Sequence, residues 1–183
     1  TGRSPVSVES TVELLTVFYT LRPEAYETLY YLMILQAEQK EYLKAIETAK
    51  QFEIIALKSG DTRLLNERFY YQYAALYERT GQLETAEKLF LSVIETGEEP
   101  LASSAKNYVA YMWAERGEKL DAGLKLVQEA LSADPENGAF LDTLGWIYYM
   151  QGRYAEALKE LQKARLVAED DPTVWEHLGD TYL

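Results

Sequence analysis

An all-α protein, built as a solenoid of antiparallel helix pairs, is the fold class that the sequence predicts. Apolar residues recur at spacings of three and four along most of the chain, as expected for amphipathic helices. No run of β-branched residues alternates with polar ones between turn signals. The motif Leu144-Gly145-x-x-Tyr148 returns 34 residues later, at Leu178, Gly179 and Tyr182. Such a period is typical of stacked repeats, in which each helix pair buries its apolar face against the next pair.

Composition limits the classes of function. The chain has 183 residues, of which 48% are hydrophobic, which is enough for a buried core. Lys and Arg number 18 against 30 Asp and Glu, and the net charge of −12 opposes binding to nucleic acid or anionic membranes. The absence of Cys excludes disulfides, thiolate nucleophiles, thiolate zinc sites and iron–sulfur clusters. No apolar run reaches the roughly 20 residues of a membrane span, so we expect no direct membrane insertion.

Residues 1–23 are expected to form a polar leader and a partial N-terminal helix of the array. Ser10 and Glu13 have the spacing of a capping box, in which each side chain satisfies a free backbone amide of the other residue. Pro23 follows Arg22 and ends this helix, because proline lacks the amide hydrogen that a helix interior needs.

The rest of the chain is expected to form about four full helix pairs and a terminal half-repeat. Gly60 supplies a left-handed C-cap and Asp61 an N-cap for the helix that follows. Asp171 and Pro172 form a favourable N-cap and first helical position for the last helix. The predicted helices cover residues 24–39, 41–58, 62–79, 82–96, 103–116, 120–133, a pair around Gly152, and 171–183. The predicted repeats are 24–60, 61–99, 100–136, 137–170 and 171–183.

The repeated residues resemble the tetratricopeptide repeat (TPR), a helix pair of 34 residues with the pattern W-x2-L-G-x2-Y, A-x3-F, A and P. The resemblance covers residues 24–183. The best repeat matches at Leu141, Leu144, Gly145, Tyr148, Ala157, Leu161 and Ala164, and the final half-repeat at Trp175, Leu178, Gly179 and Tyr182. The two repeats before them match at Val109, Ala110, Trp113, Gly123, Val127, Ala130 and Pro135, and at Tyr70, Tyr73, Ala74, Tyr77, Ala86, Phe90 and Val93.

The first full repeat departs from the pattern. Leu29, Leu32 and Ala45 fit, but Met33 stands where a small residue belongs. Gln36 replaces an aromatic residue and Lys40 replaces the glycine of the turn. The sequence therefore leaves the helix packing of this repeat open.

The resemblance implies a right-handed α-α superhelix that acts as a non-catalytic scaffold or adaptor and binds a partner segment in its concave groove. An aromatic-rich groove on an acidic protein suggests a protein or peptide partner with apolar anchors and basic flanks. One alternative for Trp146 is that it packs against the preceding repeat. In the family's register, the residues expected to line the groove are Tyr30, Ile34, Tyr71, Glu78, Asn107, Tyr111, Asp142, Trp146, Tyr149 and Met150.

Residues suited to catalysis are few. His177 lies three residues before Asp180, but we expect it to be a polar residue on the surface of the terminal helix rather than a general base. No glycine-rich phosphate loop occurs, and residues 134–138 lack the ligand spacing of a calcium loop. We therefore predict no catalytic residue, no metal site and no cofactor.

Two other roles remain open. The terminal half-repeat leaves Trp175, Leu178 and Tyr182 without their usual cover, so the chain could assemble with itself through this edge. It could also be the regulatory TPR region of a larger enzyme, or of a secretion or envelope assembly. The sequence Leu-Gly-Trp-x-Tyr-Tyr at residues 144–149 resembles TPR units of bacterial type, which suggests a bacterial protein. Its location stays open between a periplasmic or membrane-anchored lipoprotein, which we favour, and the cytoplasm.

Overall fold

The computed structural model describes residues 7–183, and within them it contains ten helices and no strand, so the all-α prediction is confirmed. The chain divides into two compact units, Thr1–Leu89 and Phe90–Leu183. Residues 1–6, which belong to the predicted polar leader, lie outside the described part.

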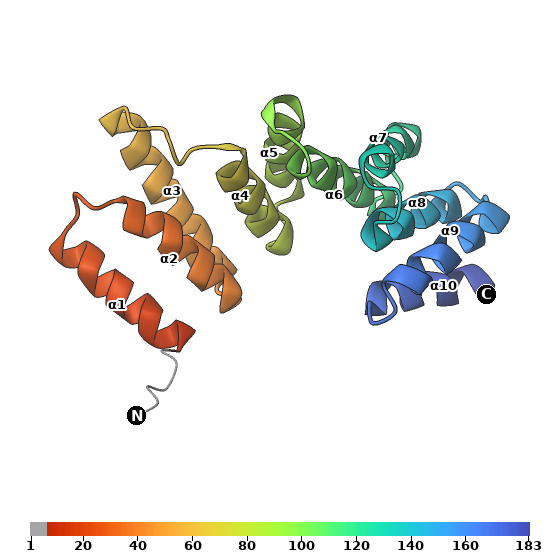
Figure 1. Cartoon of the computed structure of the whole chain (residues 1–183), viewed down its shortest axis with the longest axis horizontal. Coiled ribbons are helices and arrows are strands. Elements are labelled where there is room, and N and C mark those ends of the chain that lie inside the picture. Colours follow the sequence, from red (N-terminus) through yellow and green to blue (C-terminus); the bar gives the residue numbers. More distant parts are fainter. Residues whose placement is uncertain (1–6) are drawn as a thin grey trace. The chain divides into compact units, whose positions relative to one another are not determined.

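The helices follow one another at short intervals along the chain (Figure 1). The first unit contains α1 (Val8–Leu21), α2 (Glu27–Glu38), α3 (Tyr42–Ser59) and α4 (Glu67–Arg79). Helix α5 (Leu83–Thr96) crosses from the first unit into the second. The second unit continues with α6 (Leu101–Glu115), α7 (Leu120–Ala133), α8 (Gly138–Met150), α9 (Tyr154–Val167) and α10 (Pro172–Tyr182).

Two predicted helix starts are wrong. Helix α1 begins before Ser10, because the hydroxyl of Ser7 caps it and accepts a hydrogen bond from the Ser10 amide at 3.1 Å. Helix α4 is capped by Asn66, not Asp61. The Asp61 carboxylate instead accepts two hydrogen bonds from the Arg63 guanidinium, at 2.8 and 2.7 Å, which hold its pKa below the usual range.

Other helix ends agree with the sequence. Gly60 closes α3 in the left-handed conformation, with φ of 75°. The Asp171 carboxylate accepts a hydrogen bond from the Thr173 amide at 2.9 Å, and Pro172 is the first residue of α10. Local rules succeed here because each cap is made by residues next to the helix end.

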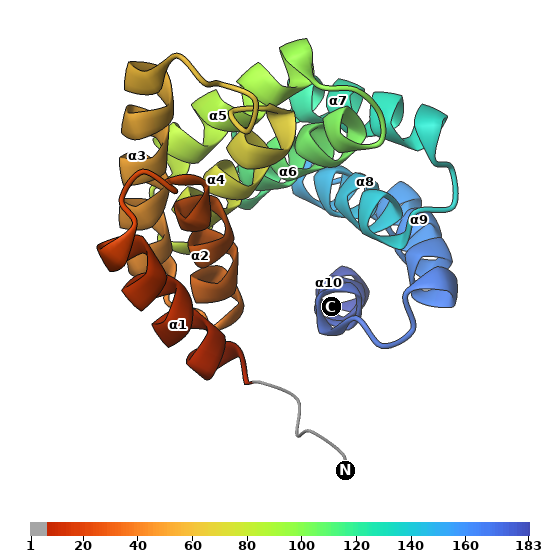
Figure 2. The ribbon, with the colours of Figure 1, turned by 60° about the vertical axis from the view of Figure 1, so that its left-hand side comes forward.

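An aromatic cluster forms the core of the first unit. Phe52 of α3 and Phe69 of α4 are fully buried, with ring centroids 5.3 Å apart. Tyr30 of α2 contacts both rings. Helix α1 lies beside α2 and α2 beside α3, as Figures 1 and 2 both show. In this unit, α2 and α4 are the first helices of two consecutive repeats.

The unusual residues of the first repeat have structural replacements. Gln36 is buried, and its side-chain oxygen accepts a hydrogen bond from the Thr48 hydroxyl of α3 at 2.8 Å. This contact joins α2 to α3 where other repeats place an aromatic ring. Lys40 adopts a positive φ of 61°, which is the conformation of the turn glycines Gly81 and Gly152 in later repeats. These substitutions change the contacts between α2 and α3, but the two helices still form a pair.

Close helix approach organises the second unit. A Cβ added to Gly145 of α8 would lie 2.6 Å from Cγ of Leu161 in α9, closer than real side chains approach. The two helices therefore meet at a point where only glycine fits. Leu161 belongs to a buried cluster with Leu141, Ala164, Val174 and Leu178, which joins α8, α9 and α10. This packing positions the side chains of α10 against those of α8.

Candidate functional site

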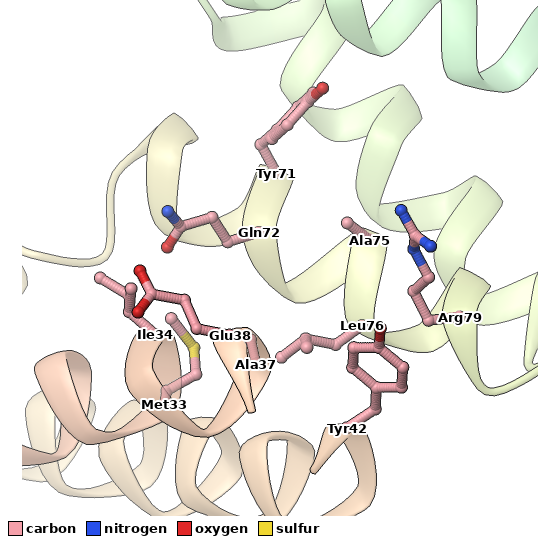
Figure 3. Close-up of a pocket in the computed structure, with 10 residues that line it drawn as sticks. All are labelled: Met33, Ile34, Ala37, Glu38, Tyr42, Tyr71, Gln72, Ala75, Leu76 and Arg79. Carbon is pink, nitrogen blue, oxygen red and sulfur yellow. The ribbon is translucent and has the colours of Figure 1, made fainter. Parts of the chain in front are cut away.

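A pocket of about 330 Å³ lies between α2 and α4 in the first unit. We call it the α2/α4 pocket (Figure 3). Two residues predicted for the groove, Ile34 and Tyr71, both line it. The complete lining is Met33, Ile34, Ala37, Glu38, Tyr42, Tyr71, Gln72, Ala75, Leu76 and Arg79.

The wall of the pocket is mainly apolar, and its polar groups are at the edge. Figure 3 shows the Gln72 amide and the Glu38 carboxylate at one end, and the Arg79 guanidinium at the other. The Gln72 side-chain oxygen is buried and accepts no hydrogen bond within the described residues. A buried acceptor left in this state costs about 1–3 kcal/mol.

Charge at this edge is negative. Nε of Arg79 lies 3.8 Å from the Glu78 carboxylate, so the neighbouring Glu78 offsets its positive charge. Glu38 is exposed, and no cation lies within 4.0 Å of it among the described residues. Burial raises the pKa of Glu78, and the Arg79 charge lowers it only partly back. The sequence missed Glu38 and Arg79 as pocket residues, although they occupy the repeat position of Met150, which it did select.

Tyr30 lies elsewhere. Only 9% of it is exposed, because its ring packs on Phe52 and Phe69 in the core, and burial raises the pKa of its hydroxyl. It therefore offers a partner no accessible surface in this structure. The physical reason is the aromatic cluster, which brings rings from three helices together around this position.

The second unit contains a different arrangement, centred on His177 of α10. Its imidazole is stacked on the indole of Trp146, with ring centroids 4.1 Å apart and planes inclined by 11°. On α8 itself, Tyr149 stacks on Trp146 at 4.7 Å. Tyr111 of α6 lies 6.2 Å from the imidazole, centroid to centroid. We call Tyr111, Asp142, Trp146, Tyr149 and His177 the His177 cluster.

A buried hydrogen bond completes this cluster. Asp142 and His177 are 5% and 4% exposed, and Nδ1 of His177 lies 3.0 Å from each oxygen of the Asp142 carboxylate. Because an ionised carboxylate can only accept, Nδ1 carries the proton and donates it. The expectation that His177 lies on the surface is therefore wrong. It pairs with Asp142, 35 residues earlier and one repeat away, and not with Asp180 on its own helix.

These contacts change what can be expected of the predicted groove residues on α8. Asp142 is buried beneath His177, so it is not available to a partner in this structure. Trp146 is partly buried and also packs on the core cluster that contains Ala110 and Ala114 of α6, which agrees with the alternative that it packs against the preceding repeat. The sequence signal that could have found this was the one-repeat spacing of Asp142 and His177.

The remaining predicted residues are half-buried. The Asn107 side-chain oxygen is buried and accepts no hydrogen bond within residues 7–183. Met150 is the last residue of α8, and its side chain reaches the turn after α6, where a Cβ on Gly117 would be 3.7 Å from its Cε. Both remain candidates for partner contact, together with Tyr111.

The outer face of α10 is open. Trp175 is 49% exposed and Tyr182 is 65% exposed, as expected for an uncovered half-repeat, whereas Leu178 is buried at 4%. A Cβ on Gly179 would meet nothing within 4 Å, in contrast to Gly145 at the same repeat position. These residues line a second pocket, of about 320 Å³, together with Gln162 and Arg165.

Two further features bear on the classes of site. Among residues 7–183, no group of three or more His, Cys, Asp or Glu side chains is arranged to hold a metal ion. None of the helices in this part of the chain has the length and hydrophobicity that a membrane crossing requires.

Comparison with known proteins identifies the repeats. Tetratricopeptide repeat family models match residues 71–138 and 116–178. The TPR repeat-containing protein PA4667 of Pseudomonas aeruginosa is 34% identical over 110 residues, which cover 60% of this chain and 18% of that protein. The chain spans less than a third of the length of the curated relatives it matches, and these relatives are bacterial.

Solved structures share the fold. A tetratricopeptide repeat protein from Parabacteroides merdae has a TM-score of 0.75 at 18% identity, over 96% of this chain and 66% of that one. YrrB, described as a TPR protein with an unusual peptide-binding site, has a TM-score of 0.71 at 18% identity, over 92% of this chain and 82% of that one. The TPR fold is in general a protein-interaction scaffold and is typically non-catalytic. With the repeat matches and the helix pairs together, the chain belongs to the tetratricopeptide repeat family.

Proposed function

We propose that the chain is a non-catalytic scaffold that binds a segment of a partner protein on the inner faces of its first helices. The observation that carries this proposal is the α2/α4 pocket, where Ile34 and Tyr71 meet at a cavity with an apolar wall. Such a cavity accepts an apolar anchor side chain, and anchors of this kind dominate binding energy at protein interfaces.

The negative charge of the chain favours a partner segment with basic residues. The chain carries a net charge of −12, and Glu38 at the pocket edge has no cation within 4.0 Å among the described residues. A segment with Lys or Arg beside its anchor is therefore favoured over an acidic one, mainly through a faster association rate. The partner class is a protein or peptide with apolar anchors and basic flanks.

A library of displayed random peptides, selected on the full chain, tests the proposal. We expect enrichment of sequences that combine an apolar residue with Lys or Arg, and weaker binding of these peptides to the variant Tyr71→Ala/Tyr111→Ala. Leu57→Ala is the control, because Leu57 is 58% exposed on α3 and lines neither site. Equal binding to the double variant and to wild type, with unchanged circular dichroism, would count against the proposal.

Self-assembly through α10 is the second candidate, and Gly179 is the observation that favours it. In the preceding repeat, Leu161 of α9 packs directly on Gly145, whereas the matching space at Gly179 is open and bordered by exposed Trp175 and Tyr182. We propose a second copy of the chain as the occupant. Light scattering across a concentration series tests this, with Gly179→Leu expected to fill the space and abolish association. A wild-type protein that stays monomeric at all concentrations would rule it out.

The activity of any longer protein that contains this chain is a separate proposal. A role as the regulatory TPR region of an enzyme, or within a secretion or envelope assembly, is compatible with curated relatives that are several times longer than the matched region. Copurification of the full gene product with its partners is the experiment that tests such a role.

A further inference from the structure

The repeat register relates the α2/α4 pocket of the first unit to the stacked rings of the second unit. In the His177 cluster, the space between α8 and α10 is filled by three stacked rings. Aligning Met33 and Ala74 with Gly145 and Gly179 shows which residues occupy the same positions in the first unit. The rings of Trp146, Tyr149 and His177 are replaced there by the smaller side chains of Ile34, Ala37 and Gln72.

All three replacements line the α2/α4 pocket. Figure 3 shows Gln72 of α4 and Ile34 of α2 on the same side of the pocket, at the repeat positions that His177 and Trp146 occupy in the second unit. The α2/α4 pocket therefore lies at the repeat positions that the stacked rings occupy in the second unit. The second unit provides an internal precedent, because an indole ring occupies the corresponding space there between flat neighbours.

We infer that the α2/α4 pocket binds the indole ring of a tryptophan in the partner segment, with a Lys or Arg beside it that pairs with Glu38. This inference rests on the proposed function and names its anchor. The half-buried apolar side chains of Ile34, Ala37 and Ala75 supply contact area for a large flat ring.

Hydrogen bonding favours indole over a purely hydrocarbon ring. The Gln72 side-chain oxygen is buried and accepts no hydrogen bond within the described residues, and Gln72 lines the pocket. An indole N–H is a donor only, so it satisfies this acceptor without needing a partner for itself. Phenylalanine fills the same space but leaves the acceptor unpaired.

The basic neighbour follows from the charges at the edge. Glu78 offsets Arg79 at 3.8 Å, whereas the exposed Glu38 carboxylate has no cation within 4.0 Å among the described residues. Glu38 occupies the repeat position of Met150, so the second unit has no matching charge. A cation next to the anchor can pair with Glu38 at the first unit's pocket, whereas the matching position of the second unit is the uncharged Met150.

Methyl NMR of the full chain tests the inference with three blocked tetrapeptides, Gly-Trp-Lys-Gly, Gly-Phe-Lys-Gly and Gly-Trp-Glu-Gly. The labelled methyl groups of Met33 and Leu76 report on the pocket. We expect saturable shifts with the Trp-Lys peptide and about threefold weaker binding of each of the other two, as the loss of one hydrogen bond or one exposed ion pair predicts. Equal binding of the Phe-Lys peptide would overturn the choice of indole.

Ile34→Trp is the blocking variant, because it places the chain's own indole where the second unit carries Trp146. We expect the peptide-induced shifts of Met33 and Leu76 to disappear. Ile54→Trp is the matched control: Ile54 is 51% exposed on α3, away from the pocket lining, and this variant should bind like wild type. Unchanged shifts in Ile34→Trp would overturn the inference.

Single substitutions separate the two contacts. Gln72→Leu is expected to weaken the Trp-Lys peptide about threefold or more while leaving the Phe-Lys peptide unchanged. Glu38→Gln is expected to remove the preference for Lys over Glu beside the anchor. If displayed peptides still depend on Tyr71 and Tyr111 but no tryptophan peptide shifts the pocket methyls, the indole inference is wrong and the scaffold proposal stands.

Discussion

His177 lies face to face with Trp146, at a centroid distance of 4.1 Å, while its Nδ1 donates to both oxygens of a buried Asp142 carboxylate. One side chain of α10 thus covers two residues of α8 that the repeat register assigned to an open groove. The contact makes the inner face of α8 part of the packing between repeats, and it leaves the α2/α4 pocket as the more accessible site.

His177→Ala is expected to lower the free energy of unfolding by about 2–4 kcal/mol, because it uncovers Trp146 and leaves a buried carboxylate without its donor. Urea denaturation followed by circular dichroism measures the change. The double variant Asp142→Ala/His177→Ala should cost at least about 1 kcal/mol less than the sum of the two single variants. Additive effects would contradict the coupling of these two residues.

Gly145→Ala is expected to cost about 1–3 kcal/mol, because its Cβ would lie 2.6 Å from Cγ of Leu161. Gly179→Ala is the matched control at the same repeat position. It meets nothing within 4 Å and should instead stabilise α10 by roughly 0.5 kcal/mol, through the higher helix propensity of alanine. Thermal unfolding of both variants gives the comparison, and shifts of the same sign would contradict the assigned packing.

Lys40→Gly is expected to raise the free energy of unfolding by about 0.5–1 kcal/mol. Lys40 has a φ of 61°, a conformation in which its Cβ is strained and glycine is not. Lys50→Gly, in the middle of α3, should have the opposite effect and cost about 1 kcal/mol. Urea midpoints of the two variants check the opposite signs, and a destabilised Lys40→Gly protein would disprove the strain.

Glu78→Gln is expected to stabilise the protein at neutral pH. Because burial raises the pKa of Glu78, the folded state binds its proton more tightly than the unfolded state does. Stability from this group is present below the ordinary glutamate pKa of about 4.3 and is lost as the pH rises through that value to the raised one. The variant should therefore exceed wild type in thermal midpoint at pH 7 and match it near pH 3.5, with exposed Glu84→Gln showing no such difference.

The sequence was a good guide wherever a signal was local or repeated. Gly60, Asp171 and Pro172 cap their helices as predicted, since each acts on backbone groups beside it. The helix 120–133 has the predicted bounds. The repeat register selected Ile34 and Tyr71, which line one pocket, because it assigns both to the inner faces of first helices in neighbouring repeats.

Competition between neighbouring partners caused the local errors. Asp61 has the residue type of an N-cap, but the Arg63 guanidinium takes its carboxylate, and Asn66 caps α4 instead. Ser7 caps α1 ahead of Ser10. In both cases several residues near the helix start have a suitable side chain, and only the folded geometry selects among them.

The sequence by itself determined the helical class, the repeat register and the family, because periodic apolar residues and turn glycines act within a single helix pair. Tertiary structure alone decided which inner-face residues are covered and which remain open. His177 covers Asp142 and Trp146 from a helix one repeat later, while Ile34, Ala37 and Gln72 leave a pocket at the matching positions. The physical reason is side-chain volume: equivalent positions fill or leave open the space between helices according to the size of residues that meet only after folding.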